Sequence, residues 1–195
     1  MGRLLLVRHA ESEGNRDRVF TATPAVGLTE RGREQAGTTA GWIGSRYEPR
    51  RIVTSPYARA RETAAILAAR LGLAAVVEED LRERDYGRLA GLPYTTPRPD
   101  FDAARYWLWR PEGGETLVEV AARVGAVLDR LSREDPAGEI VVVSHGAAMM
   151  AAYWHVTGAW PPAGRVVRNA GVVVVEHREG SYHGTSEAAE DDVTG

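Results

Sequence analysis

Short apolar runs alternate along the chain with longer segments in which apolar residues recur every three or four positions. Short continuous apolar runs are typical of buried strands. Strands are predicted at Leu4–Arg8, Ile52–Ser55, Ala75–Glu78 and Ile140–Ser144, with a fifth at Val172–His177 near an edge of the sheet. Because strands that alternate with helices indicate βαβ units, we expect an α/β fold. It would be a three-layer α/β/α sandwich around a mainly parallel central sheet.

Four helices are predicted between and after these strands. One begins near Thr29 and runs through Arg33–Trp42, and another follows Gly146. The other two show an apolar stripe that would face the sheet. The stripes consist of Ala60, Ala64, Leu67 and Leu71, and of Leu117, Val120, Ala121, Val124, Leu128 and Leu131.

One segment, residues 88–114, lacks a clear pattern and is rich in proline and glycine. A loop of this length inside a compact domain is usually functional or disordered, and its cluster of Tyr106, Trp107 and Trp109 favours a lid over a pocket. We expect Arg105 or Arg110 to lie near a second anionic group there. Residues 1–185 are predicted to form a single catalytic domain with this inserted lid, and residues 186–195 a flexible acidic tail.

Composition narrows the possible chemistry. The chain has no cysteine, and all 24 residues counted as Lys+Arg are arginine. Disulfides, thiolate metal sites, cysteinyl-phosphate intermediates, Schiff bases and phosphate-loop lysines are therefore excluded. The net charge of −3 gives no general attraction to nucleic acid or to an anionic membrane, so we expect neither as a partner.

The start of the chain bears on location. The apolar run Leu4–Val7 is far shorter than the core of a signal peptide or a spanning helix. We therefore expect a cytoplasmic protein, either a monomer or a homodimer.

Residues with catalytic potential follow the predicted strands. Arg8 and His9 end the first strand, Arg59 follows the second, Glu83 follows the third, and His145 follows the fourth. Ligands of such sheets bind at the carboxyl ends of the strands, so these side chains are expected to converge. The set suits phosphoryl transfer through a histidine, because imidazole can attack phosphorus without first losing a proton from an alcohol or thiol.

The remaining side chains have natural roles in that reaction. The guanidinium groups of Arg8 and Arg59 can each donate paired hydrogen bonds to phosphoryl oxygens, and the uncharged amide of Asn15 can donate another. A protonated His145 would contribute further positive charge, and Glu83 is the best candidate for general acid and then base. We expect no metal and no cofactor, because arginine and a cationic histidine can supply the charge that magnesium supplies elsewhere.

Several separated motifs resemble those of the histidine phosphatase superfamily, in its phosphoglycerate-mutase-like branch 1. The resemblance covers roughly residues 3–177. Its motifs are Leu6-Val7-Arg8-His9-Ala10-Glu11-Ser12, Leu28-Thr29-Glu30-Arg31-Gly32, Ser55-Pro56-Tyr57-Ala58-Arg59-Ala60, Leu81-x-Glu83-x-x-x-Gly87, Gly113-Gly114-Glu115-Thr116 and Val143-Ser144-His145-Gly146.

The resemblance implies a phosphoglycerate-mutase-like fold and family roles for six residues. His9 would be the phosphorylated histidine, Glu83 the proton donor, and Arg8, Asn15, Arg59 and His145 the phosphate-binding groups. Ser12 and Thr21 are further candidates for contact with the substrate. One position departs from the signature, since Ala10 stands where the family usually has glycine.

These observations predict a phosphoric monoester hydrolase that acts on a small phosphorylated substrate. Two alternatives stay open: a phosphoglycerate mutase, and a non-catalytic module that binds a phosphorylated ligand or a protein. The Glu83-Arg84-x-Tyr86-Gly87 sequence is somewhat mutase-like. However, the family's mutases carry a long basic insertion after this segment, whereas only 31 residues lie between Glu83 and Glu115 here. That compactness favours hydrolysis.

Overall fold

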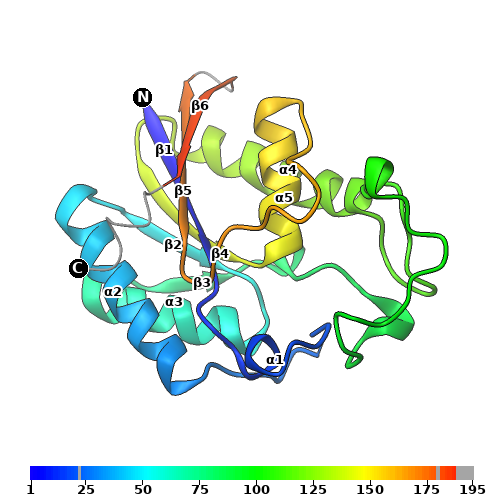
Figure 1. Cartoon of the computed structure of the whole chain (residues 1–195). Coiled ribbons are helices and arrows are strands. Elements are labelled where there is room, and N and C mark those ends of the chain that lie inside the picture. Colours follow the sequence, from blue (N-terminus) through cyan, green and yellow to red (C-terminus); the bar gives the residue numbers. More distant parts are fainter. Residues whose placement is uncertain (22, 179–180, 188–195) are drawn as a thin grey trace.

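A six-stranded sheet forms the centre of the part of the chain that the computed structural model describes, which is residues 1–21, 23–178 and 181–187 (Figure 1). The strand order is β3-β2-β4-β1-β5-β6. The first four of these strands run parallel, and β5 and β6 are antiparallel to their neighbours. The strands are β1 (Gly2–Arg8), β2 (Arg51–Thr54), β3 (Ala75–Val77), β4 (Glu139–Ser144), β5 (Val172–Arg178) and β6 (Ser181–Glu187).

Helices cover both faces of this sheet, as Figure 1 shows. Alternation along the strands assigns each face, because successive side chains of a strand point to opposite sides. In β1, Leu5 and Val7 belong to the core with α2 and α3, whereas Leu4 and Leu6 belong to the core with α4 and α5. The helices are α1 (Glu13–Arg16), α2 (Glu30–Arg46), α3 (Ala58–Leu71), α4 (Leu117–Glu134) and α5 (Gly146–Thr157).

The helix starts follow from local sequence. Thr29 caps α2 by accepting a hydrogen bond from the backbone N–H of Gly32 over 3.0 Å. Thr116 and Glu119 form a reciprocal capping box at the start of α4. The three-layer α/β/α prediction is therefore confirmed, with each predicted helix present and each predicted strand present to within one or two residues.

Strand register places the functional segments side by side. Arg8, the last residue of β1, is opposite Ser144, the last residue of β4. Thr54, the last residue of β2, is opposite Val143. The residues that follow these strands, His9, Ser55 and His145, therefore leave the sheet at the same edge.

The C-terminal part of the sheet differs from the prediction. β5 lies near an edge as predicted, but the edge itself is formed by an unpredicted strand, β6. The sequence of β6 is Ser-Tyr-His-Gly-Thr-Ser-Glu, which lacks the apolar alternation by which half-buried strands are recognised. Residues 186 and 187 of the predicted tail belong to this strand, and residues 188–195 lie outside the described residues.

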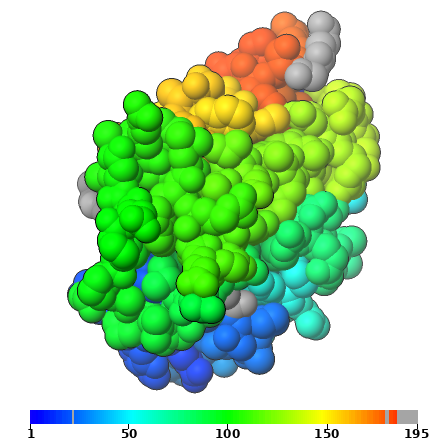
Figure 2. All heavy atoms as spheres, turned by 90° about the vertical axis from the view of Figure 1, so that its right-hand side faces the viewer, coloured from blue at the N-terminus to red at the C-terminus, as the bar shows by residue number. Residues whose placement is uncertain are grey.

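The segment predicted as a lid has little regular structure. It contains the short 3-10 helices η2 (Gly87–Leu89) and η3 (Ala103–Arg105), and a third one, η1 (Glu79–Leu81), precedes it. Figure 2 shows this segment in green beside the blue spheres of the N-terminal part of the chain. Within the described ranges, no helix combines the length and the apolar character that crossing a bilayer requires.

Candidate active site

A cavity of about 400 Å³ opens at the carboxyl ends of the parallel strands. The predicted site residues that line it are Arg8, His9, Ser12, Asn15, Thr21, Arg59 and Glu83. His145 lies directly behind, since the ring centroids of His9 and His145 are 5.0 Å apart and the next two residues, Gly146 and Ala147, line the cavity. All the residues predicted for the site therefore come together.

His9 presents one nitrogen toward the cavity side of the site. Its Nδ1 lies 2.7 Å from the carbonyl oxygen of Ala10, which can only accept a hydrogen bond. Nδ1 therefore carries the proton, and Nε2 keeps its lone pair. Burial and the nearby guanidinium groups of Arg59 and Arg8 hold the pKa of His9 well below its usual range, which keeps the ring neutral. A neutral imidazole with an unprotonated Nε2 is the form that can act as a nucleophile.

Two arginines flank His9. Arg59 is 1% exposed, and its guanidinium donates hydrogen bonds to the carbonyls of Thr21 and Thr23 and, from Nε, to Nε2 of His9. Arg8 donates to the carbonyl of Val167 over 2.7 Å, while its buried Nε has no hydrogen-bond partner. Neither cation forms an ion pair with a carboxylate of the described residues. Two desolvated guanidinium groups without a counter-ion are an anion-binding arrangement.

Asn15 is held in one orientation by its side-chain oxygen. Oδ1 accepts hydrogen bonds from the backbone N–H of Ser12, from the Ser12 hydroxyl and from Nδ2 of Asn169. Because the oxygen is occupied, the amide NH₂ group is the part of this cavity-lining side chain that is left to bind a ligand. Ser12 and Thr21 also line the cavity, but their hydroxyls donate to Asn15 and to the carbonyl of Val19, respectively.

Asn169 was not predicted from the sequence. Its Nδ2 donates both to Oδ1 of Asn15 over 3.0 Å and to the carbonyl of His9 over 3.1 Å. It precedes Ala170, which adopts a positive φ of 59°. Ala10, the departure from the family signature, is not among the residues with positive φ, so alanine fits there without backbone strain.

Glu83 reaches the site from the segment that follows β3. Its Oε1 accepts hydrogen bonds from the backbone N–H groups of Arg84, over 2.9 Å, and Ala147, over 3.2 Å. The second bond connects the carboxylate to the first turn of α5, two residues after His145. Glu83 is 8% exposed and lines the cavity, so it can exchange a proton with a bound ligand.

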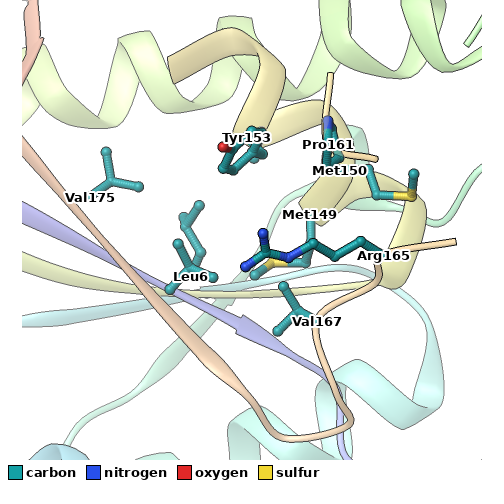
Figure 3. Close-up of a pocket in the computed structure, with 10 residues that line it drawn as sticks. Leu6, Met149, Met150, Tyr153, Pro161, Arg165, Val167 and Val175 are labelled. Carbon is teal, nitrogen blue, oxygen red and sulfur yellow. The ribbon is translucent and has the colours of Figure 1, made fainter. Parts of the chain in front are cut away.

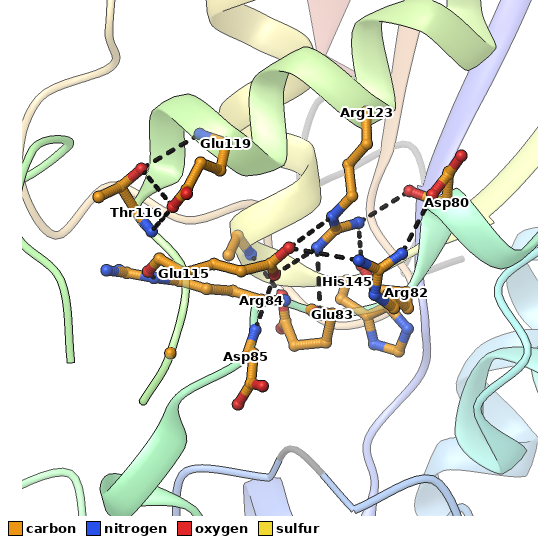
Figure 4. A network of polar contacts seen from close by, with 12 residues as sticks. Asp80, Arg82, Glu83, Arg84, Asp85, Glu115, Thr116, Glu119, Arg123 and His145 are labelled. Carbon is orange, nitrogen blue, oxygen red and sulfur yellow. Dashed lines mark hydrogen bonds and ion pairs between the residues drawn. The ribbon is translucent and has the colours of Figure 1, made fainter. Parts of the chain in front are cut away.

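An ionic network on α4 fixes the backbone around Glu83 (Figure 4). Arg123 donates to the carbonyls of Asp80, Arg82 and Glu83 at 2.8–3.2 Å and pairs with Glu115 over 2.9 Å. Glu115 in turn accepts from the backbone N–H of Asp85 over 2.9 Å. This side of the site is therefore held by hydrogen bonds to four backbone groups rather than by packing alone.

His145 caps α5 and is fully buried. Its Nε2 lies 2.6 Å from the hydroxyl of Ser55, and its Nδ1 has no hydrogen-bond partner. Burial, assisted by Arg59, His9 and Arg8, holds the pKa of His145 well below its usual range. These surroundings disfavour the protonated His145 expected from the sequence, because three neighbouring groups that are or can become cationic oppose another charge.

The far end of the cavity contains two more arginines. Arg98 lies over the ring of Phe101, at 4.3 Å, and near Trp109, at 5.8 Å. Arg84 lies 5.3 Å from the Trp109 ring and donates to the carbonyls of Glu115 and Trp109. Both line the cavity, and neither forms an ion pair with a carboxylate of the described residues. This end can therefore bind a second anionic group.

This arrangement corrects the expectation for Arg105 and Arg110, neither of which lines the cavity. Arg110 pairs with Glu119 at 2.7 Å.

The residues of the aromatic cluster lie in two places. Tyr106 and Trp109 line the cavity, whereas Trp107 stacks on Trp160 with ring centroids 5.9 Å apart. Since the segment lacks a helical or strand period, its side-chain directions could not be assigned from spacing.

A second, smaller pocket lies between α5, β5 and the segment 161–167 (Figure 3). Its volume is about 30 Å³, and apart from Arg165 and Tyr153 its walls are apolar side chains and Pro161. Among the described residues, no carboxylate or histidine lines it, so the larger cavity is the candidate active site.

Comparisons with known proteins agree with this geometry. The family profile of the histidine phosphatase superfamily (branch 1) matches residues 4–187. Glucosyl-3-phosphoglycerate phosphatase of Mycobacterium tuberculosis is 34% identical over 83% of this chain and 80% of the relative. A 2,3-bisphosphoglycerate-dependent phosphoglycerate mutase of Parvibaculum lavamentivorans is 33% identical, with 75% of each chain covered. A bifunctional protein of Mycobacterium tuberculosis is 36% identical, and this chain spans 41% of its length.

Solved structures lead to the same family. The mycobacterial glucosyl-3-phosphoglycerate phosphatase in complex with VO₃ superposes with a TM-score of 0.84 at 28% identity, covering 96% of this chain and 97% of the other. A phosphoserine phosphatase of Entamoeba histolytica, at 22% identity, has the same fold, with a TM-score of 0.86 and coverage of 99% and 100%. The chain described here belongs to the histidine phosphatase superfamily, branch 1.

Proposed function

We propose that the protein is a metal-independent phosphatase that hydrolyses phosphate monoesters through a phosphohistidine on His9. The observation that carries this proposal is a buried His9, held neutral by its surroundings, whose unprotonated Nε2 lies beside Arg59 and near Arg8. Among the described residues, neither guanidinium pairs with a carboxylate. A site for binding alone would not need a nucleophile and a carboxylate on the two sides of one cavity. This arrangement argues against the non-catalytic module.

The reaction follows from these positions in two steps. Nε2 of His9 attacks phosphorus, the bond from phosphorus to the ester oxygen breaks, and Glu83 gives its proton to the leaving oxygen. A water molecule then attacks the phosphohistidine, Glu83 takes the proton from that water, and inorganic phosphate leaves with His9 restored. Arg8 and Arg59 stabilise the charge on the phosphoryl oxygens in both steps.

The same site could return the phosphoryl group to a substrate, as the related mutases do. Two features favour water as the acceptor. The short connection from Glu83 to Glu115 leaves no room for a long basic insertion, and the relatives with matching length include phosphatases. The mutase reading nevertheless makes a distinct prediction, which is interconversion of 3- and 2-phosphoglycerate in the presence of the bisphosphate.

We further propose that the substrate carries a second anionic group. Arg84 and Arg98 supply the positive charge at the far end of the cavity, and Trp109 lies against both. Two related phosphatases are named for the substrates glucosyl-3-phosphoglycerate and phosphoserine, and both compounds carry a carboxylate besides the phosphate. The compound that this protein hydrolyses would share that feature.

Phosphate release from p-nitrophenyl phosphate, 3-phosphoglycerate and phosphoserine, measured in EDTA, tests the proposal. Release should persist in EDTA and disappear in His9→Ala. It should be unchanged in His155→Gln, a matched control whose histidine lies on α5 and bonds to Asp129 over 2.8 Å, outside the cavity. An acid-labile phosphoryl label that persists in His9→Ala would exclude His9 as the nucleophile.

A further inference from the structure

Ser55 is buried completely and follows β2 directly. Its hydroxyl has two polar neighbours among the described residues. The backbone N–H of Tyr57 donates to Oγ over 3.3 Å, and Nε2 of His145 lies 2.6 Å away. No catalytic role was expected for this serine from the sequence.

The hydrogen-bonding groups around Ser55 decide which atom donates in its contact with His145. A hydroxyl has one proton to donate, and a buried donor without an acceptor costs about 1–3 kcal/mol. The N–H of Tyr57 cannot accept. Nε2 of His145 is therefore the acceptor within reach, and it must present its lone pair to the serine.

The other nitrogen of His145, Nδ1, then carries the proton of the ring. A neutral imidazole that accepts at Nε2 carries its proton on Nδ1. That nitrogen is buried and has no hydrogen-bond partner among the described residues, so it is a donor left without a protein acceptor. The ring lies edge-on to His9, with the two planes inclined at 61°. Because the two ring centroids are 5.0 Å apart, a phosphoryl group carried on His9 would lie beside the His145 ring and could supply the acceptor that Nδ1 lacks.

We propose that Ser55 is a positioning residue that holds His145 as the neutral Nδ1–H tautomer, so that the ring donates a hydrogen bond to the phosphoryl group. The backbone carbonyl of Ala10 does the same for His9. The two histidines thus share one tautomer and use it for opposite purposes. In His9 the unprotonated nitrogen attacks, whereas in His145 the protonated nitrogen binds the ligand. This inference relies on the proposed function only for the identity of that ligand.

The tautomer can be read directly from the imidazole nitrogens in a long-range ¹H–¹⁵N spectrum of the full chain at pH 8. The signals of His145 are identified by their loss in His145→Gln. We expect a protonated Nδ1 and an unprotonated Nε2 in the wild type. Addition of vanadate or inorganic phosphate should shift the Nδ1 signal as the hydrogen bond forms. This measurement does not depend on turnover, so it separates failure of this inference from failure of the proposed function.

Variants of Ser55 test its part in setting the tautomer. Ser55→Ala removes the hydroxyl and Ser55→Cys replaces it with a weak donor of similar size, so both should shift His145 toward the Nε2–H form. Both should also weaken phosphate inhibition and lower kcat/KM by about tenfold, which corresponds to losing one hydrogen bond to a charged group. Ser55→Thr keeps the hydroxyl and should restore the Nδ1–H form.

Ser132→Ala is the matched control, because Ser132 is equally a buried serine but bonds to the carbonyl of Asp129 within α4. It should leave the His145 spectrum and the kinetics unchanged. A wild-type His145 protonated at Nε2, or at both nitrogens, would overturn the inference. So would an Nδ1–H signal that persists in both Ser55→Ala and Ser55→Cys.

Discussion

Nε of Arg59 donates a hydrogen bond to Nε2 of His9 over 3.2 Å, so the arginine occupies the lone pair that the proposed reaction requires. The bond holds the imidazole at a fixed angle. It must break when His9 attacks, and the guanidinium is then free to turn to the phosphoryl oxygens. Arg59 would thus serve both the resting and the reacting state of the nucleophile.

Replacement of Arg59 by lysine tests this double role. An ammonium keeps the charge but cannot bond to Thr21, Thr23 and His9 together, because it lacks the planar fork of guanidinium. We expect kcat/KM to fall by about 100-fold or more, equivalent to roughly 3 kcal/mol of transition-state stabilisation. Arg61→Lys, on the exposed face of the same helix, is the control and should leave kcat/KM unchanged. Equal kinetics for the two variants would contradict the assignment.

Glu83→Gln should separate substrates by their leaving groups. The amide keeps the shape and the acceptor for the N–H of Ala147 but cannot donate a proton to an ester oxygen. Turnover of alkyl phosphates should fall by about 100-fold or more, whereas the first step with p-nitrophenyl phosphate, whose leaving group needs no proton, should fall far less. Burst kinetics give the first step separately. Glu112→Gln, in an exposed ion pair with Arg88, serves as the control. Equal losses on both substrates would argue against an acid role.

Arg98→Ala should discriminate between substrates with and without a second anion. Loss of a charge-assisted hydrogen bond predicts that kcat/KM for phosphoserine or 3-phosphoglycerate falls by about tenfold or more relative to p-nitrophenyl phosphate. Arg105→Ala, in the same segment but outside the cavity, should not change this ratio. An unchanged ratio in Arg98→Ala would place the second anion elsewhere.

The pH dependence follows from the lowered pKa of His9 and of His145. An unperturbed histidine would lose its nucleophilic form below about pH 6.5. Because both pKa values are lowered, the rate of His9 phosphorylation should persist below that pH and fall only as the lower pKa is approached. Rapid-quench measurement of the phosphoenzyme from pH 4.5 to 8 would test this. A midpoint at or above 6.5 would contradict the electrostatic account.

The same shifts affect stability with a defined sign. The unfolded histidines bind protons below about pH 6.5, while the folded ones resist protonation, so their unfolded state is favoured as the pH falls from 6.5 toward the folded pKa. Urea unfolding at pH 7.5 and 5.5 should show a larger loss of stability for wild type than for His145→Gln, which removes one of these groups.

Gly87 should matter for stability more than its neighbour Gly91. Both have positive φ, 50° and 80°, but a Cβ at Gly87 would collide with the backbone of Glu112 and Gly114, whereas a Cβ at Gly91 would meet nothing within 4 Å. Gly91→Ala should cost about 1 kcal/mol from backbone strain alone, and Gly87→Ala considerably more. Thermal unfolding of the two variants gives the comparison. Equal losses of stability would show that the close approach of Gly87 to Glu112 and Gly114 does not restrict the residue at position 87.

Much of this fold could be predicted because its signals are local. Buried strands such as β1 and β4 are continuous apolar runs, and α4 carries both a capping box and an apolar stripe. The convergence of His9 and His145 followed from the rule that parallel strands end at one edge. By contrast, β6 is polar and joins the sheet through backbone hydrogen bonds, so the pattern of its side chains does not predict a strand.

The site residues that escaped prediction act through long-range contacts. Asn169 bonds to Asn15, which is 154 positions away in the chain, and Ser55 meets His145 across 90 positions. Arg98 is one arginine among many in an irregular segment, and only the folded backbone brings it to the cavity. The lowered pKa of His145 escaped prediction for a related reason, since it depends on burial and on neighbours that spacing does not reveal.

The close approach of Gly87 to Glu112 and Gly114 has a consequence for how this protein could diversify. The two ends of the intervening segment meet, so the segment can be lengthened, shortened or exchanged while the sheet below keeps its register. His9, Arg59 and His145 lie outside that segment, whereas Arg98 and Trp109 lie within it. Sequence changes confined to this segment can therefore alter which substrate the protein binds, while the residues that carry out phosphoryl transfer stay the same.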